Sequence, residues 1–217
     1  MSFPSDFSAH LNADLRAKFS SLVSPFAIQE YLDSLSYIGE ARDRSPLNVM
    51  LDRQCHCLDG GLFAALALWQ IGFKPLLIDL APDPGMDDDH VLALYQVDGH
   101  WGAVAKSNYV NLGFREPVYK NLRELVMTYF EHYISVHQEK TLRGYTRPFD
   151  ASRYTHLNWA WDEAGANQLY HRHFYRRKTI PLITARMAKR LTPVTDHAYA
   201  AETMYTNLEE AFGNRNS

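Results

Sequence analysis

The chain has very few cysteines: only two among 217 residues, both in the tripeptide Cys55-His56-Cys57. A disulfide between residues two positions apart would close a small, strained ring, so the chain cannot rely on a disulfide framework. This absence favours a reducing compartment, and we therefore expect a cytoplasmic protein.

The chain also lacks a long apolar run. The longest, residues 62–71, is about half the roughly 20 residues that a membrane-spanning helix needs. Residues 1–10 lack the basic start and apolar centre of a secretory signal. We therefore expect no membrane partner.

Acidic residues are absent between Ala164 and Thr195. The basic residues there are Arg172, Arg176, Arg177, Lys178, Arg186, Lys189 and Arg190. We interpret residues 172–190 as a basic face, either solvated or paired with the acids of residues 83–89; a site for an anionic substrate is the second interpretation. The formal net charge of −3 and the lack of a recognition motif argue against a nucleic-acid partner.

The overall composition is that of a globular protein, with 46% hydrophobic and 22% charged residues. The length suits one domain over residues 1–217. Within it, residues 1–46 predict N-terminal packing helices, residues 47–112 a core of helix and strands, and residues 113–217 mostly helical additions. The predicted fold class is α+β.

A helix that is apolar on nearly every face follows Cys57 and ends at Gly72. Such a helix belongs in the middle of a domain. A cysteine at its start lies beside free N–H groups and the positive end of the helix dipole, which favour the thiolate. We therefore predict that Cys57, rather than Cys55, is a nucleophile.

Two strand-like runs, residues 91–97 and 100–106, flank Asp98-Gly99, a strong signal for a two-residue hairpin turn. In such a hairpin Val97 faces His100, and continuing the same register places His90 opposite Ser107. Asn108 points to the other face unless a bulge intervenes. His90 is therefore the candidate base for Cys57, because a cysteine nucleophile needs a base within reach.

Several spaced features resemble the transglutaminase-like superfamily over roughly residues 47–112. They are Cys57-x-Asp59, the helix residues Ala64, Ala65, Leu66 and Leu68, the sequence Gly72-Phe73-Lys74-Pro75, and the segment HVLALYQVDGHW from His90 to Trp101. The resemblance implies a papain-like core with a central helix, starting at the cysteine, packed on an antiparallel sheet.

The resemblance also implies a function. Cys57 would attack an amide or ester carbonyl and form a thioester, with His90 as general base and acid and a third residue orienting the imidazole. The protein would be a hydrolase or an acyl or amide transferase, and its substrate a peptide, a protein side chain or a small molecule. This chemistry needs no cofactor.

The sequence departs from the family at the third residue. The family's usual aspartate falls on Ala105, so the orienting role moves to Ser107 or Asn108, or is lost. Gln54 is a supporting candidate for the oxyanion site, and Asp59 for a favourable interaction with the helix dipole.

Two other interpretations compete with the enzyme. An inactive transglutaminase-like domain that binds a peptide or protein partner in the cleft stays open, because the aspartate is missing. A metal centre built on Cys55-His56-Cys57 and His90 is disfavoured, because structural zinc sites space paired ligands more widely and a second pair is lacking. We therefore expect no metal.

Overall fold

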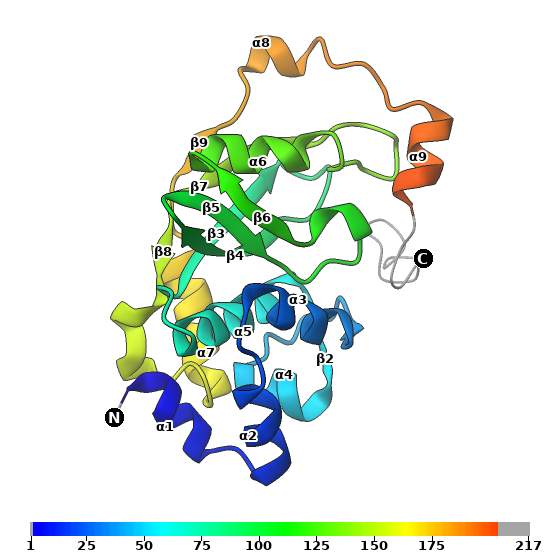
Figure 1. Cartoon of the computed structure of the whole chain (residues 1–217). Helices are drawn as coiled ribbons and strands as arrows, with labels where there is room; N and C mark the ends of the chain where they lie inside the picture. The colour runs from blue at the N-terminus through cyan, green and yellow to red at the C-terminus, as the bar shows by residue number, and fades with distance from the viewer. Residues whose placement is uncertain (1, 204–217) are drawn as a thin grey trace.

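The computed structural model describes residues 2–203, in which helices cover both faces of an antiparallel sheet (Figure 1). The order of strands is β6-β5-β4-β3-β7-β9, and β8 also pairs with β3. The strands are β3 (Leu76–Pro82), β4 (His90–Val97), β5 (His100–Val104), β6 (Arg115–Tyr119), β7 (Leu142–Thr146), β8 (Phe149–Asp150) and β9 (Thr179–Pro181). The predicted α+β class with an antiparallel sheet is confirmed.

The central hairpin of β4 and β5 has the register that its turn residues predict. Asp98 and Gly99 both have positive φ, 49° and 79°, as a two-residue turn requires. Val97 pairs with His100 and the ladder continues to Ala93 opposite Val104.

Side chains of β4 alternate between two separate hydrophobic cores. Val91, Ala93 and Tyr95 belong to the core that contains helix α5 (Cys57–Gln70), whereas Leu92 and Leu94 belong to the core of helix α6 (Leu122–Phe130). The sheet is therefore buried on both faces, with α5 on one side and α6 on the other (Figure 1).

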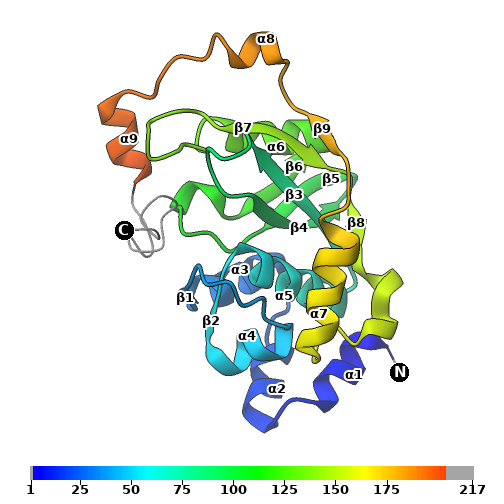
Figure 2. The ribbon, with the colours of Figure 1, turned by 180° about the vertical axis from the view of Figure 1, so that it is seen from behind.

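Further helices surround α5 on its side of the sheet (Figure 2). They are α1 (Phe3–Ala9), α2 (Ala13–Ser20), α3 (Pro25–Asp33), α4 (Pro46–Asp52) and α7 (Glu163–Leu169). Shorter elements are the 3-10 helices η1 (Val110–Leu112) and η2 (Ala151–Leu157), the π-helix η3 (Tyr170–Phe174), and the helices α8 (Ala185–Ala188) and α9 (Asp196–Glu202). None of the helices in residues 2–203 combines the length and apolarity needed to cross a membrane.

Helix α5 packs directly on β4 because its first turn carries two glycines. A Cβ atom on Gly61 would stand only 2.7 Å from Cγ1 of Val91, and one on Gly60 would collide with the buried side chain of Lys106. The Gly60-Gly61 pair therefore brings the first residues of α5 close to the beginning of β4.

A small parallel sheet aligns the segment that leads into α5. Strand β1 (Ser36–Tyr37) pairs with β2 (Gln54–Cys55), with Ser36 opposite Gln54. Cys55 is completely buried there, and the chain turns at His56 into the helix.

Residues 113–217, predicted as mostly helical additions, also contribute strands to the main sheet. Within the described part of this range, β6, β7, β8 and β9 all join the main sheet. These strands could not be recognised in the sequence because they are short. In addition, β7 pairs with β3, which lies some sixty positions earlier. Residues 204–217 lie outside the described residues.

Candidate active site

Cys57 is the first residue of α5 and is partly accessible to solvent. Its thiol lies 3.7 Å from the backbone carbonyl oxygen of Asp89, to which it donates. The backbone N–H of Val91 is a hydrogen-bond partner of the thiolate and lowers its pKa. The sulfur thus contacts the backbone on both sides of His90.

The four residues predicted to do chemistry line one small cavity. Cys57, His90, Ser107 and Asn108 all face a space of about 30 Å³. The other residues that line it are Tyr37, Asp87, Asp88, Asp89, Tyr109, Leu112, His132, Tyr133 and Ile134. The fold therefore brings together residues from the start of α5, the start of β4 and the segment after β5.

His90 is held by a backbone carbonyl group. Its Nε2 atom lies 2.8 Å from the carbonyl oxygen of Leu112, which can only accept, so Nε2 carries the proton and Nδ1 is left as the basic nitrogen. The side chain is buried, with 4% of the residue exposed. Burial lowers the pKa of His90 to about 4, although the bond to Leu112 opposes the shift.

Ser107 and Asn108 line the same cavity as His90, but the partner of its Nε2 atom is the carbonyl oxygen of Leu112. The hydroxyl oxygen of Ser107 accepts a hydrogen bond from the backbone N–H of Tyr109 at 2.9 Å, and Asn108 is 2% exposed. The sequence could not indicate Leu112, because every residue carries a carbonyl group.

A second, larger cavity of about 150 Å³ opens on the other side of Cys57. Its lining is Tyr37, Gly39, Glu40, Asp43, His56, Cys57, Leu58, Asp88, Asp89 and Tyr175. Four carboxylates thus line this approach to the thiol together with the imidazole of His56.

His56, which the sequence analysis considered only as part of a disfavoured metal centre, lines this cavity. Its Nε2 atom lies 3.5 Å from Oδ1 of Asp43 and 3.5 Å from Oδ1 of Asp59. Burial lowers the pKa of His56, but hydrogen bonds with Asp43 and the Cys57 thiolate, together with the charge of Asp59, outweigh burial and raise the pKa to about 11. His56 is therefore an imidazolium next to the thiol.

The two cysteines differ in their surroundings. Burial raises the pKa of the Cys57 thiol, while the hydrogen bond with His56 works in the opposite direction. Burial raises the pKa of Cys55 to about 12, which makes it an inert core residue. Because the pKa of Cys57 is raised and that of His90 is lowered, the resting site holds Cys57 as a neutral thiol and His90 as a neutral imidazole.

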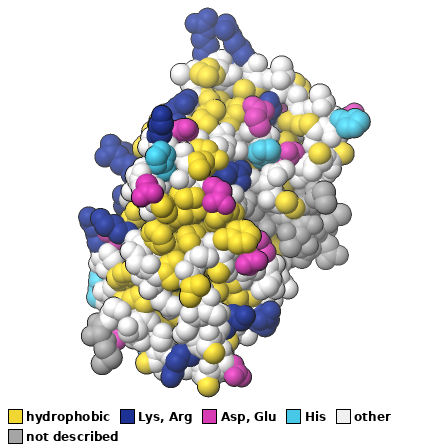
Figure 3. All heavy atoms as spheres, viewed as in Figure 1, with side chains coloured by type: hydrophobic (Ala, Val, Ile, Leu, Met, Phe, Trp, Pro, Cys, Tyr) yellow, Lys and Arg dark blue, Asp and Glu magenta, His cyan; other side chains and the backbone are white. Residues whose placement is uncertain are grey.

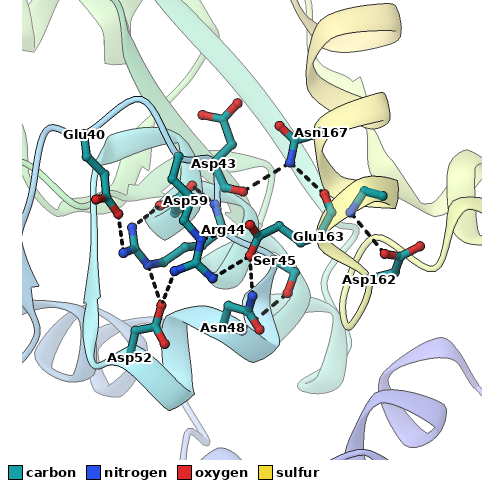
Figure 4. Close-up of polar contacts among 12 residues, drawn as sticks. Glu40, Asp43, Arg44, Ser45, Asn48, Asp52, Asp59, Asp162, Glu163 and Asn167 are labelled. Carbon is teal, nitrogen blue, oxygen red and sulfur yellow. Dashed lines mark hydrogen bonds and ion pairs between the residues drawn. The ribbon is translucent and has the colours of Figure 1, made fainter.

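Asp59 lies outside both cavities that contain Cys57, on the buried side of α5 (Figure 4). Its Oδ1 atom accepts from the backbone N–H of Arg44 at 2.8 Å, and the Arg44 guanidinium lies 3.8 Å from Oδ2. Burial raises the pKa of Asp59 to about 7. Asp59 thus fixes the loop before α4 to the start of α5. Gln54 also lies outside both cavities.

The side chains of Asp43, His56 and Asp59 are the group in residues 2–203 whose geometry could hold a metal ion, with ligand atoms within 4.8 Å of one another. The carboxylate oxygens of Asp43 and Asp59 already have basic side chains as neighbours. His56 lies between the two carboxylates, Arg44 faces Asp59, and His171 lies 2.9 Å from Asp43. A cation would have to compete with these side chains for the carboxylate oxygens.

No protein-family model and no curated protein matches the sequence. Among solved structures, LapG of Legionella pneumophila is similar, with 12% identity and a TM-score of 0.38 over 52% of this chain and 76% of that one. EGTA-treated LapG from the same organism gives 12% identity and a TM-score of 0.39, over 54% and 75% of the two chains. The likeness concerns about half of this chain.

Proposed function

We propose that the protein is a cysteine-dependent hydrolase or acyl transferase that acts on an amide or ester through a thioester on Cys57. The observation that carries the proposal is the placement of the thiol at the start of α5, against the backbone on both sides of His90 and in one cavity with its side chain. A nucleophile beside a base that is itself oriented by a third group is the arrangement that acyl transfer needs.

In the first step the Cys57 sulfur attacks the carbonyl carbon while Nδ1 of His90 takes the thiol proton. The bond to Leu112 keeps the Nε2 proton in place and supports the imidazolium that forms. Collapse of the tetrahedral intermediate breaks the bond to the amine or alcohol, which leaves with the proton from His90. The product is a thioester on Cys57.

The oxyanion of that intermediate must be stabilised by hydrogen-bond donors or by a positive charge. The first N–H groups of α5 have no partner within the helix, and the His56 imidazolium lines the same cavity as Cys57. Donors fixed before the reaction stabilise the developing charge without reorganisation. We therefore propose His56, rather than Gln54, as the side chain that supports the oxyanion.

In the second step His90 removes a proton from water or from an acceptor amine, which attacks the thioester and releases Cys57. Hydrolysis and transfer differ only in which of the two nucleophiles enters.

The test is a panel of amide and ester substrates, with and without a primary amine, given to the wild-type protein and to Cys57→Ala. Iodoacetamide labelling followed by mass spectrometry reports the thiol directly, and Cys55→Ala is the matched control. The proposal expects turnover and labelling that are lost in Cys57→Ala and kept in Cys55→Ala.

The opposing result would be no turnover of any substrate in the panel by the folded wild-type protein, whatever the labelling rate of Cys57. That result would favour the non-catalytic alternative, a domain that binds a peptide or protein partner in the cleft.

A further inference from the structure

A basic cavity of about 660 Å³ lies apart from both cavities at Cys57. Its walls are the turn after η3, residues 176–178, the strand β9 and the end of β7. The lining residues are Arg147, His173, Arg176, Arg177, Lys178, Thr179, Ile180 and Pro181. It shares none of its lining residues with the cavities that Cys57 lines, although the neighbouring Tyr175 belongs to one of them.

The charge of this cavity is uncompensated. Three arginines and one lysine line it, and no carboxylate does. Within residues 2–203, none of these four cations forms an ion pair with an acidic side chain. The acids of residues 83–89 do not supply partners for them; Asp83 pairs with Arg143 instead. Lys and Arg side chains gather along the edge of the molecule near β9 (Figure 3).

One of these cations is held in position by neutral groups alone. Arg177 donates from Nη2 to the carbonyl oxygen of Pro148 at 3.1 Å, and its guanidinium carbon lies 5.5 Å from the centre of the Phe149 ring. Its Nε atom is buried without a hydrogen-bond partner among the described residues. A cation fixed in this way loses little freedom when an anion arrives, which favours binding.

The turn that carries the cations is closed by an unusual helix. In η3 the backbone N–H of Tyr175 donates to the carbonyl oxygen of Tyr170 at 3.0 Å, which is the i to i+5 bond of a π-helix. Single π turns are rare and frequently lie at functional sites. This one ends at Phe174, and its capping residue Tyr175 directly precedes the run Arg176-Arg177-Lys178 that lines the cavity.

We propose that this cavity binds a small anion with two or more phosphoryl groups, of which pyrophosphate is the simplest. Three of the four cations are arginines, whose planar forks match phosphoryl oxygens with paired hydrogen bonds. The cations come from two neighbouring segments, Arg147 directly after β7 and residues 176–178 directly before β9, which pairs with β7, so two linked phosphoryl groups meet both. The volume is that of a small-molecule site, which usually lies between about 300 and 1,000 Å³.

The experiment measures binding of pyrophosphate to the intact chain by isothermal titration calorimetry at physiological ionic strength. The test variant Arg176→Gln/Lys178→Gln removes two exposed cations from the cavity. The matched control Arg186→Gln/Lys189→Gln removes the same charge from α8 and the residue after it, outside the cavity. Arg147→Gln tests the cation that follows β7, and circular dichroism checks that each variant folds.

We expect saturable binding of one pyrophosphate that weakens at least about tenfold in the test variant, as charge-assisted hydrogen bonds are lost. Arg147→Gln should also weaken it, and the α8 control should leave it unchanged. Equal weakening by the control would overturn the site in favour of diffuse attraction, and the absence of saturable binding would overturn it outright. Tighter binding of a polyglutamate peptide than of pyrophosphate would also overturn it, in favour of an acidic peptide. None of these readouts uses Cys57 activity.

Discussion

The Nε2 atom of His90 lies 2.8 Å from the carbonyl oxygen of Leu112, the last residue of η1. A backbone carbonyl therefore stands where a cysteine hydrolase with a side-chain triad would use aspartate or asparagine. It fixes the tautomer of the imidazole without adding a negative charge. The imidazole of His90, our proposed base, is accordingly oriented by a main-chain group, and its orientation depends on how the chain folds after β5.

The first prediction distinguishes the contribution of His90 to turnover from that of Ser107. In Ser107→Ala we expect turnover to stay close to the wild-type rate, because the hydroxyl oxygen binds the Tyr109 N–H. In His90→Gln we expect turnover to fall by about 10²–10⁴-fold, the usual contribution of a general base. Steady-state rates on one substrate, with melting temperatures as the control for folding, decide the matter. A large loss in Ser107→Ala would reassign the orienting role to that hydroxyl.

The second prediction concerns pH. Because burial raises the pKa of Cys57, its iodoacetamide labelling rate should keep rising with pH through about 9, the usual range of a thiol. The pKa of His90, lowered to about 4, keeps the base neutral well into the acid range, so turnover should persist below the usual histidine pKa. Rates measured across this range check both. A labelling rate already constant at neutral pH would instead mean a resting thiolate–imidazolium pair.

The third prediction concerns His56. Replacing it with glutamine removes the positive charge beside the thiol, so labelling of Cys57 should slow at every pH at which His56 is protonated. Turnover should fall by about 10²–10³-fold if His56 supports the oxyanion.

His171→Gln is the matched control for His56. His171 also pairs with Asp43, at 2.9 Å, but it does not line the cavities that contain Cys57. We expect His171→Gln to leave both labelling and turnover unchanged. Equal effects of the two substitutions would show that Asp43, and not the charge of His56, matters.

Local patterns in the sequence predicted the parts of the site that depend on neighbours along the chain. The apolar run after Cys57 predicted α5, and Asp98-Gly99 predicted the β4–β5 register, since a tight turn fixes which residues pair. Ser107 and Asn108 could be placed near His90 by extending that register. Their roles stay predictions.

The remaining parts depend on contacts between distant segments. Residues 142–146 lack a clear alternation because β7 lies inside the sheet, between β3 and β9. Asp43 reaches His56 through a loop that carries no motif of its own. These contacts arise from tertiary packing, which residue periodicity does not encode.

The fourth prediction tests the close approach of α5 to the sheet. Gly61→Ala would place a methyl group 2.7 Å from Cγ1 of Val91. Overpacking of this kind typically costs about 1–3 kcal/mol of unfolding free energy, and it would move Cys57 away from the start of β4. Urea denaturation measures the loss. Val91→Ala added to Gly61→Ala should restore part of it, whereas simple addition of the two losses would contradict the steric explanation.

The fifth prediction concerns the buried charge beneath the site. Arg44 is 1% exposed, pairs with Asp52 at 2.9 Å and with Glu40, and faces the fully buried Asp59 (Figure 4). Arg44→Met would remove one of the two cations that face the buried Asp59 and leave His56 as the other, and breaking a buried pair costs about 3–5 kcal/mol. Arg42→Met removes an exposed arginine that also pairs with Asp52, at 2.9 Å, and should cost about 0–1 kcal/mol.

The pH dependence of the Arg44→Met loss has a definite sign. Burial raises the pKa of Asp59 to about 7 in the folded protein. The pKa of an aspartate in the unfolded chain is about 3.9. Between this value and about 7, the folded state therefore binds more protons than the unfolded state. As the pH rises through this window, the carboxyl of Asp59 increasingly opposes folding. Without Arg44 the charged carboxylate is less compensated, so the loss should be larger above the window than below it. Urea denaturation of Arg44→Met and Arg42→Met at a pH below this window and at a pH above it measures the difference. A loss of unfolding free energy that does not depend on pH would mean that packing of the arginine stem, rather than the charge on Asp59, causes it.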